Sequence, residues 1–297
     1  MRMSSASTSA EFITAIPEIG ASNPVSPGIW MYQRQKGIAM DRKLWPATGG
    51  TIAAIAVTTT LDATGYTMLS ALPLMPLAGL FWFLQRFSTQ EMGLLWGQVR
   101  HYGVALAYPI FVLGVTTLVA VAFGAVDTSD TDWNKTIANI GLMSSTGILM
   151  VLITEEGFFR GWLWASLKRG GQSDTQVLAW STLAFTAWHI SAITLDTGFD
   201  IPANEVPVYL INATLIGGVF GLIRLMSGSV IAPTLCHAVW NGLDYPLFGY
   251  GEKVGALGIQ QTHIYGSEVG ILGIGLNLVF FACLWRKFTT QAHDISP

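Results

Sequence analysis

Long apolar runs that carry almost no charge divide this chain, and they constrain its fold more than any other feature. Only 11% of the residues are charged, 51% are hydrophobic, and the mean hydropathy is +0.49. Soluble domains carry roughly 25% charged residues, so this chain has too few charges to cover a water-facing surface. We therefore expect an integral membrane protein that is surrounded by the lipid bilayer.

A helix needs about 20 apolar residues to cross the hydrocarbon core of a bilayer. Measured with that length, the chain offers about eight spans, and we predict an all-α, polytopic transmembrane helical bundle. The candidate spans cover residues 44–61, 66–85, 102–124, 137–167, 175–195, 206–225, 229–247 and 268–285. The fourth is too long for one perpendicular crossing, so its last residues, 162–167, are expected at the membrane interface.

Composition along the chain predicts three parts and an orientation. Residues 1–43 are expected to form a flexible cytoplasmic N-terminal tail, residues 44–136 the N-terminal transmembrane helices, and residues 137–290 a transmembrane core that holds the motifs described below. Lys and Arg collect in the segments on one side, whereas the opposite loops hold only Lys135 and Lys253. Because cytoplasmic segments are enriched in Lys and Arg, both termini are expected in the cytoplasm. A bacterial plasma membrane is the expected location.

Charge and cysteine content argue against two other classes of protein. The 15 Lys and Arg residues against 18 Asp and Glu residues give a formal net charge of −3, which provides no basic face for a nucleic acid. Cys236 and Cys283 both lie in apolar runs, where a thiol usually packs as a small hydrophobic group. We expect neither a nucleic-acid partner nor a structural disulfide.

Three of the predicted spans contain ionisable residues, which are costly in hydrocarbon and are usually functional or paired there. The polar residues are Glu155, Glu156 and Arg160 in the fourth span, His189 in the fifth, and His237 and Asn241 in the seventh. At 1.5 Å per residue, Glu155, His189 and His237 each lie about 20 Å from a charged residue at the cytoplasmic end of their span. They are therefore predicted to share one layer near the middle of the membrane.

Helical spacing separates the roles of these residues. Glu156 and Arg160 are four residues apart in the favourable order for a helix pair, so we predict a structural ion pair. Glu155 points about 100° away around the helix, which leaves its carboxylate free to face a cavity. His237 and Asn241 are also four residues apart and offer an imidazole and an amide on one face.

Two imidazoles and a carboxylate from three helices suit a transition metal and a water molecule. Imidazole is a common zinc ligand, so His189 and His237 are expected metal ligands, with zinc or another divalent metal as the cofactor. Glu155 is expected to take a proton from water, and Asn241 to stabilise a developing oxyanion. Phe185 stands one turn before His189 and is expected to wall its ring. Together these residues predict a hydrolase.

These motifs resemble those of the CAAX protease and bacteriocin-processing family of intramembrane metalloproteases, also called the Abi or type II CAAX prenyl endopeptidase family. EExxxR is present as Glu155, Glu156 and Arg160, FxxxH as Phe185 and His189, and HxxxN as His237 and Asn241. The resemblance covers residues 150–245. It implies an endopeptidase in which Glu155 activates water and His189, His237 and Asn241 complete the site. The implied substrate is a peptide or protein at the membrane, whether prenylated or otherwise processed.

Two other functions compete with this hypothesis. A proton or metal-ion carrier also places acids and histidines in the middle of the membrane, but it should show a polar pathway to both sides. The outer halves of the fourth and seventh spans are instead largely apolar, which favours a closed reaction chamber. A catalytically inactive scaffold of the same family would not need the intact Glu155, His189 and His237. The peptidase is therefore the leading hypothesis.

Overall fold

The computed structural model describes the backbone of residues 27–294 and the side chains of residues 43–290. The chain divides into two units, Met1–Ala39 and Met40–Pro297. Residues 1–26 of the predicted tail lie outside the described residues. Helix α1 (Pro27–Ala63) begins inside the segment predicted as tail.

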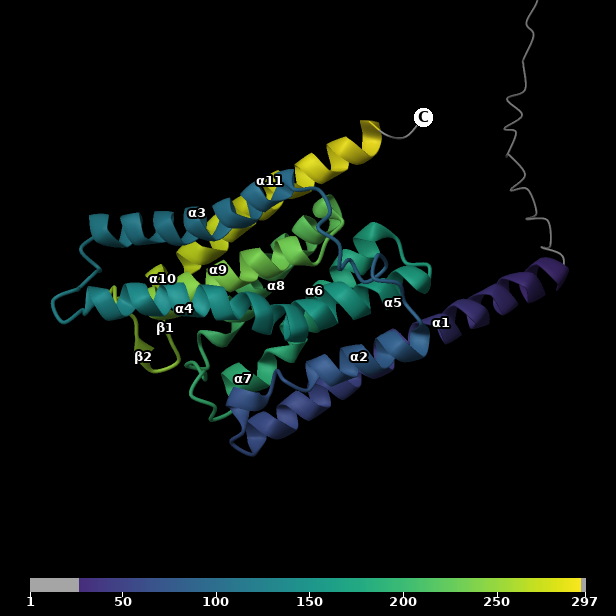
Figure 1. Ribbon diagram of the computed structural model, residues 1–297, viewed down its shortest axis with the longest axis horizontal. Coiled ribbons are helices and arrows are strands. Elements are labelled where there is room, and N and C mark those ends of the chain that lie inside the picture. The colour runs from purple at the N-terminus through teal and green to yellow at the C-terminus, as the bar shows by residue number, and fades with distance from the viewer. Residues whose placement is uncertain (1–26, 295–297) are drawn as a thin grey trace, which may run out of the picture. The chain divides into compact units, whose positions relative to one another are not determined.

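The second unit is a bundle of helices with one short hairpin (Figure 1). Besides α1, its long helices are α2 (Leu74–Gln85), α3 (Arg100–Ala122), α4 (Trp133–Val151), α6 (Asp174–Trp188), α8 (Val206–Ser227), α9 (Ile231–Phe248) and α11 (Ile271–Asp294). The shorter elements are η1 (Thr67–Leu69), η2 (Leu152–Leu163), α5 (Trp164–Arg169), α7 (Ile190–Thr194), α10 (Thr262–Tyr265), β1 (Gly249–Tyr250) and β2 (Lys253–Val254). The two strands pair antiparallel, with Gly249 opposite Val254.

The prediction of an all-α membrane bundle is confirmed. Among the described residues, six helical segments are long and apolar enough to cross a membrane. They are Thr67–Gln85, Arg100–Ala122, Trp133–Arg169, Asp174–Thr194, Val206–Ser227 and Ile271–Thr290. The predicted spans 44–61 and 229–247 are helical too, within α1 and α9, but they are not among the six. Both are rich in polar side chains, and the count of eight spans is not confirmed.

Helices α8 and α9 lie at the centre of the bundle. Helix α9 packs against α4 and α3, and α8 packs against α6 and α11. Large apolar side chains such as Phe83, Leu118, Leu142 and Val279 are instead more than half exposed on the outer helices. An apolar outer surface is costly in water, so these faces are suited to contact with lipid tails.

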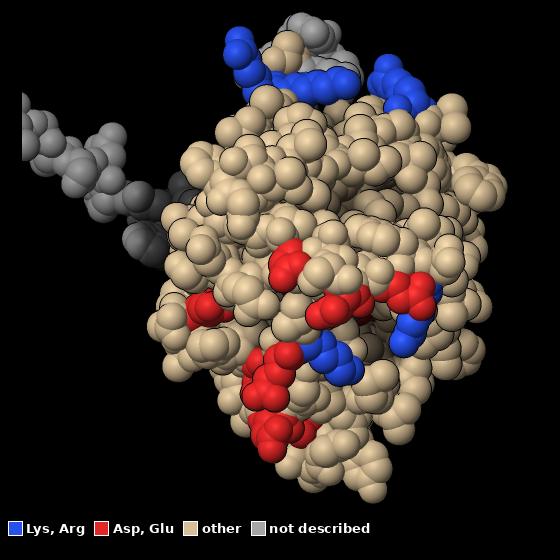
Figure 2. Space-filling view, turned by 90° about the vertical axis from the view of Figure 1, so that its left-hand side faces the viewer, with Lys and Arg blue, Asp and Glu red and all other residues tan. Residues whose placement is uncertain are grey.

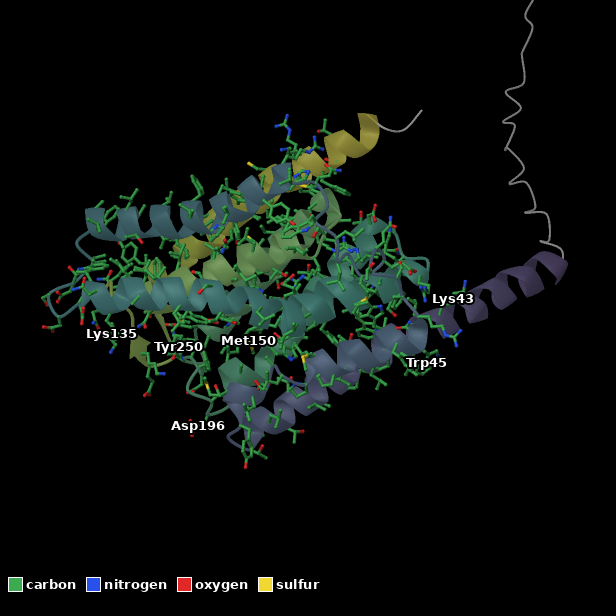
Figure 3. The ribbon with its side chains drawn as sticks, in the orientation of Figure 1. Lys43, Trp45, Lys135, Met150, Asp196 and Tyr250 are labelled. Atoms are coloured by element: carbon green, nitrogen blue, oxygen red, sulfur yellow. The ribbon has the colours of Figure 1, made fainter. Side chains whose placement is uncertain are left out.

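The two ends of the bundle differ in the side chains that they expose. Lys43 and Trp45 lie at one end, and Lys135, Asp196 and Tyr250 at the other (Figure 3). We call the second end the hairpin end, because it carries β1 and β2. Figure 2 looks onto it and shows acidic side chains grouped there. The exposed acidic residues of its loops are Asp127, Asp130, Asp132, Asp196 and Glu252.

The long fourth span contains a π-helix that the sequence pattern did not predict. Residues Trp133–Arg169 form one helical length of 37 residues, but Leu152–Leu163 within it are wound as a π-helix. Backbone hydrogen bonds in this winding join residues five apart, and such turns are frequent at functional sites. Gly157 permits it, since an added Cβ would collide with the carbonyl oxygen of Leu152, five residues earlier.

Candidate active site

The polar residues predicted for one layer of the membrane surround one small cavity, which we call the reaction cavity. Its volume is about 50 Å³, which is room for a few water molecules. Glu155, His189, His237 and Asn241 all line it, together with Phe185. The structure thus brings together all four residues that were predicted to carry the chemistry, from η2, the end of α6 and α9.

Glu155 directs one carboxylate oxygen between the two histidine rings. Its Oε2 lies 3.9 Å from Nε2 of His189 and 3.8 Å from Nε2 of His237. This oxygen is buried and has no hydrogen-bond partner among the described residues. The two separations are too long for direct hydrogen bonds. They match a third atom, such as a water oxygen, placed between the carboxylate and the rings.

His189 is oriented by a break in its helix. Helix α6 starts with a capping box made by Ser173 and Gln176 and ends at Trp188. The backbone N–H of His189 bonds to the carbonyl oxygen of Thr186, so the carbonyl of Phe185 is free to accept from the ring. Nδ1 of His189 lies 2.8 Å from that oxygen. Nε2 is therefore left to face the cavity.

His237 is held by its other ring nitrogen. Nδ1 lies 3.1 Å from Oε1 of Glu156, and the ring stacks on Phe220 with centroids 4.8 Å apart. A hydrogen bond at Nδ1 fixes the tilt of the imidazole and leaves Nε2 available. Phe185 packs edge-on against both histidine rings, with centroids 4.4 Å from His189 and 5.9 Å from His237. The wall predicted for His189 is present and serves both rings.

The predicted ion pair between Glu156 and Arg160 is present and fully buried. Oε1 of Glu156 lies 3.2 Å from Nη1 of Arg160, and Nη2 donates to the carbonyl oxygen of Gly217 at 3.0 Å. The guanidinium carbon lies 4.2 Å from the centroid of the Phe185 ring, a favourable cation–π distance. Because Glu156 also bonds to His237, this pair joins η2, α8 and α9 around the reaction cavity.

The donor set can be compared with what a water molecule and a metal ion each require. Each histidine has its Nδ1 engaged by an acceptor, as in many zinc sites. Among the described residues, however, no group of three His, Cys, Asp or Glu side chains is arranged to hold a metal. Ligands of one tetrahedral zinc are about 3.4 Å apart, and hydrogen-bond partners of one tetrahedral water are about 4.6 Å apart. The Glu155 oxygen lies 3.8 and 3.9 Å from the histidine nitrogens, between these two separations.

Two acidic residues near the site were not identified from the sequence. Glu268, placed at the very start of the last predicted span, lines the reaction cavity, and its Oε1 accepts a hydrogen bond of 2.9 Å from Nε1 of Trp240. Asp244 is only 2% exposed and accepts from Oγ of Ser267. A signal for Asp244 was available, since it is an acid inside a predicted span and follows Asn241 by three residues. No sequence signal pointed to Glu268, because this residue lies in the loop before α11, which begins at Ile271.

A second cavity, which we call the vestibule, adjoins the reaction cavity. Its volume is about 330 Å³, and Glu155, His189, Tyr209, Tyr245 and Glu268 line both cavities. The other walls come from the 199–205 loop, the β1–β2 hairpin and residues 259–269. Several of the hairpin residues are exposed. The vestibule therefore connects Glu155, which is partly buried, with the hairpin end.

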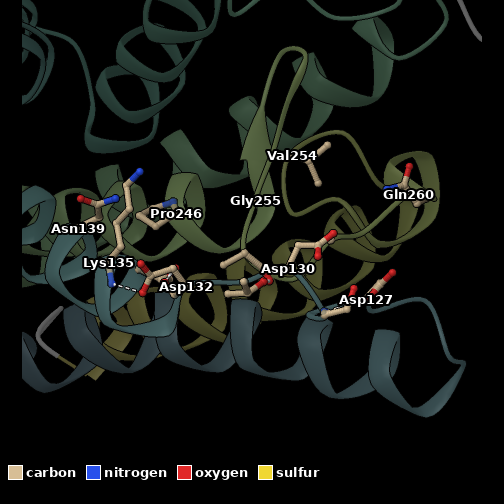
Figure 4. Close-up of a pocket in the computed structure, with 14 residues that line it drawn as sticks. Asp127, Asp130, Asp132, Lys135, Asn139, Pro246, Val254, Gly255 and Gln260 are labelled. Atoms are coloured by element: carbon tan, nitrogen blue, oxygen red, sulfur yellow. Dashed lines mark hydrogen bonds between the residues drawn. The ribbon is translucent and has the colours of Figure 1, made fainter.

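The hairpin end also carries an acidic cleft of about 500 Å³ that contains none of the predicted site residues (Figure 4). Its acids serve the local backbone: Asp132 caps α4 by accepting from the N–H of Lys135 at 3.1 Å, and Asp127 accepts from the N–H of Ser129 at 3.0 Å. The bonds from Ser129 lower the pKa of Asp127. The acids of this cleft thus stabilise a loop and the start of α4, and the cleft is separate from the reaction cavity.

Comparison with known families matches one segment of the chain. Residues 137–243 match the family model described as type II CAAX prenyl endopeptidase Rce1-like. The resemblance noted from the three motifs is thereby confirmed, and every residue of those motifs lies inside the match. No match is found among curated proteins.

Proposed function

We propose, for a chain whose residues 137–243 belong to the Rce1-like type II CAAX prenyl endopeptidase family, that the reaction cavity hydrolyses a peptide bond of a membrane-associated substrate. The family and the apolar helices support a CAAX-type intramembrane protease. The roles of single residues and the substrate are our proposal. One observation carries it: the unpartnered Glu155 oxygen lies within 4 Å of both histidine Nε2 atoms.

Glu155 is proposed as the general base. A water held between Oε2 of Glu155 and Nε2 of His189 loses a proton to Glu155 while the water oxygen attacks the carbonyl carbon of the substrate. Nε2 of His189 orients that water, because Nδ1 is already engaged with Phe185. When the tetrahedral intermediate collapses, Glu155 returns the proton to the leaving nitrogen. The products are a carboxylic acid and an amine.

Asn241 and the protonated ring of His237 are proposed to donate hydrogen bonds to the carbonyl oxygen as its negative charge develops. The ring must be protonated because its Nδ1 already donates to Glu156. Asn241 and His237 lie one turn apart on α9, and both line the reaction cavity. Donors that are fixed in advance stabilise such a charge strongly in a site that excludes bulk water. Glu156 fixes the ring of His237, so Glu156 acts as a positioning residue.

A peptidase fits the packing better than a carrier does. The vestibule links Glu155 with the hairpin end. On the other side of Glu155 along η2, the side chains of Phe158, Phe159 and Trp162 are fully buried in the core. A carrier needs polar access from both sides, whereas a reaction chamber needs it from one. Ion flux and peptide cleavage measured on the same proteoliposomes separate the two functions.

The orientation proposed for the protein follows from its charges. Lys43 lies at the end opposite the hairpin (Figure 3), and α5, which ends with Lys168 and Arg169, lies toward the same end (Figure 1). With both termini in the cytoplasm, as Lys and Arg enrichment favours, the hairpin end and the mouth of the vestibule face the other side of the membrane. A substrate peptide would enter from there.

A divalent metal held by His189 and His237 is the alternative form of the same proposal. It is supported by two Nε2 atoms that face one cavity, whereas the absence of a three-residue metal-binding group among the described residues supports the water-only form. Metal analysis of purified protein beside its Glu155→Ala and His237→Ala variants decides between them. Zinc that is bound by the wild type, lost in the histidine variant and kept in the glutamate variant supports ligation. A wild-type protein that carries no zinc supports the water-only form.

The test of the proposed function is cleavage of a membrane-anchored peptide by the purified protein in liposomes, with products identified by mass. The same peptide with and without a prenyl group shows whether prenylation is required. We expect a single cut that needs Glu155, and an absence of cleavage over a broad peptide set would contradict the proposal.

A further inference from the structure

The vestibule is strongly acidic, and the proposed reaction uses only one of its acids. The carboxylates that line it are Glu155, Glu205, Asp244, Glu252 and Glu268. Lys253 is the only Lys or Arg among the described residues that line it. Its Nζ donates to the hydroxyl oxygen of Tyr250 at 2.6 Å and lies 4.6 Å from the centroid of that ring. This lysine belongs to the hairpin, so no Lys or Arg among the described lining residues pairs with the deeper acids.

Asp244 is the deepest of these unpaired acids. Asp244 is 2% exposed, and one of its carboxylate oxygens accepts a hydrogen bond from Oγ of Ser267. Among the described residues, no hydrogen bond reaches the other oxygen and no ion pair involves Asp244. A buried carboxylate is costly unless a cation or several donors compensate it. A positively charged group of a bound substrate would compensate this carboxylate.

Glu268 is held rigidly at the boundary of the two cavities. Nε1 of Trp240 fixes its carboxylate, and Nδ2 of Asn212 fixes its backbone by donating to its carbonyl oxygen at 2.9 Å. Asn212 in turn accepts from Asn277 on α11 at 3.0 Å. A carboxylate positioned by such a network is preorganised to bind a ligand without first being ordered. Arg160 does not neutralise it, since its guanidinium is bonded to Glu156 and Gly217.

Aromatic rings complete the walls around these acids. Trp188, Tyr209 and Tyr245 line the inner vestibule, and Phe199 stacks on Tyr250 at the mouth with centroids 4.7 Å apart. Ring faces attract ammonium and guanidinium groups, and they also cover the apolar stem of a long basic side chain. A volume of about 330 Å³ lies within the usual range for ligand pockets.

From this combination we infer that the vestibule is a specificity pocket for a Lys or Arg side chain of the substrate, with Asp244 and Glu268 as its binding carboxylates. The inference rests on the proposed peptidase function. Asp244 follows Asn241 by three residues, or about 4.5 Å along the helix, so the basic side chain belongs to a residue close to the bond that is cut.

The test uses one membrane-anchored peptide varied at a single position beside the cut, with Arg, norleucine or Glu. We expect kcat/KM to rise at least about tenfold from norleucine to Arg, because buried polar groups of a site discriminate strongly against a substrate that leaves them unpaired. Glu268→Gln and Asp244→Asn should each reduce that ratio toward one. Asp196→Asn removes an exposed acid of the same end that does not line the vestibule, and it should leave the ratio unchanged.

A binding measurement separates failure of this inference from failure of the proposed function. The Glu155→Gln variant in liposomes is titrated with fluorescent forms of the three peptides, so that no cleavage is needed. Tighter binding of the Arg peptide, lost in the added Asp244→Asn change, supports the pocket. Equal binding and equal cleavage of the three peptides would overturn it while leaving a peptidase. Selective binding of the Arg peptide without cleavage by the wild type would instead contradict the proposed function.

Discussion

Glu156 fixes the ring of His237, with its Oε1 3.1 Å from Nδ1. The opposite ring nitrogen, Nε2, lies 3.8 Å from Glu155. The two consecutive glutamates therefore act on one imidazole from its two sides. Because the side chain of Glu156 has no exposed surface, water does not compete for its contact with the ring.

Glu155→Gln should fold normally and lose most of its peptidase activity. The amide preserves the shape of the side chain but cannot accept a proton from water, and a positioned general base contributes about 100-fold to 10,000-fold. Steady-state cleavage in liposomes measures the loss, and a thermal unfolding curve checks the fold. Turnover close to that of the wild type would remove Glu155 from the chemical step.

Glu156→Gln and Arg160→Ala should destabilise the protein. Each change leaves a buried charge or donor without its partner, and breaking a buried ion pair costs about 3–5 kcal/mol. The measurement is the midpoint of thermal unfolding in detergent, with the exposed Glu252→Gln as a control. If both variants were as stable as the wild type yet inactive, the pair would belong to the catalytic step.

Asn241→Ala should reduce kcat by about 100-fold to 1,000-fold while KM changes little. The reason is that an oxyanion donor makes its full contact only in the transition state. Asn139→Ala is the matched control, because Asn139 is exposed on α4. A rise in KM at constant kcat would show that Asn241 binds the ground state of the substrate.

Gly157→Ala should impair both stability and activity. An added Cβ would collide with the carbonyl oxygen of Leu152, whereas one at Gly141, in the same helical length, has open space around it. Gly141→Ala is thus the control, and it should be neutral or slightly stabilising because alanine favours helix. The thermal unfolding midpoints of the two variants are compared. Equal midpoints would mean that η2 rewinds without cost.

The ion pair between Glu91 and Arg169 should add stability that depends on pH. A backbone hydrogen bond from Ser88, and then the Arg169 side chain, lower the pKa of Glu91 below its ordinary value of 4.5. Its contribution is therefore complete above that value and is lost as the pH falls through the lowered pKa. The pair is partly exposed, so the effect is below about 1 kcal/mol. Unfolding midpoints of the wild type and Glu91→Gln should differ at pH 7 and converge in acid.

Much of this architecture could be predicted from the sequence, because apolar length and the spacing of polar residues are local properties. The layer that joins Glu155, His189 and His237 followed from counting residues between charges. The π-helix did not, since Leu152–Leu163 has no hydrophobic pattern that separates it from an α-helix. The orientation of His189 also escaped, because it depends on a helix break that leaves one carbonyl of Phe185 unused.

The convergence of Glu268 on the site is a tertiary effect. The last predicted span was expected to begin at residue 268, but α11 starts at Ile271, and Glu268 instead bonds to Trp240 on another helix. Glu268 reaches the cavity because Asn212, which bonds to Asn277, holds its backbone. The spacing of residues along the sequence does not predict these contacts. For the same reason the second role of Glu156, as a partner of His237, became visible only in three dimensions.

The match to the family ends at residue 243, directly before Asp244, the hairpin and Glu268. The proposed hydrolytic residues lie inside the matched segment, whereas the hairpin and the two proposed binding carboxylates lie outside it, so the two sets can diverge at different rates. Relatives that share the motifs are expected to differ in what they admit. A chimaera that receives residues 244–269 from such a relative should inherit the donor's choice of peptide while keeping its own hydrolytic groups.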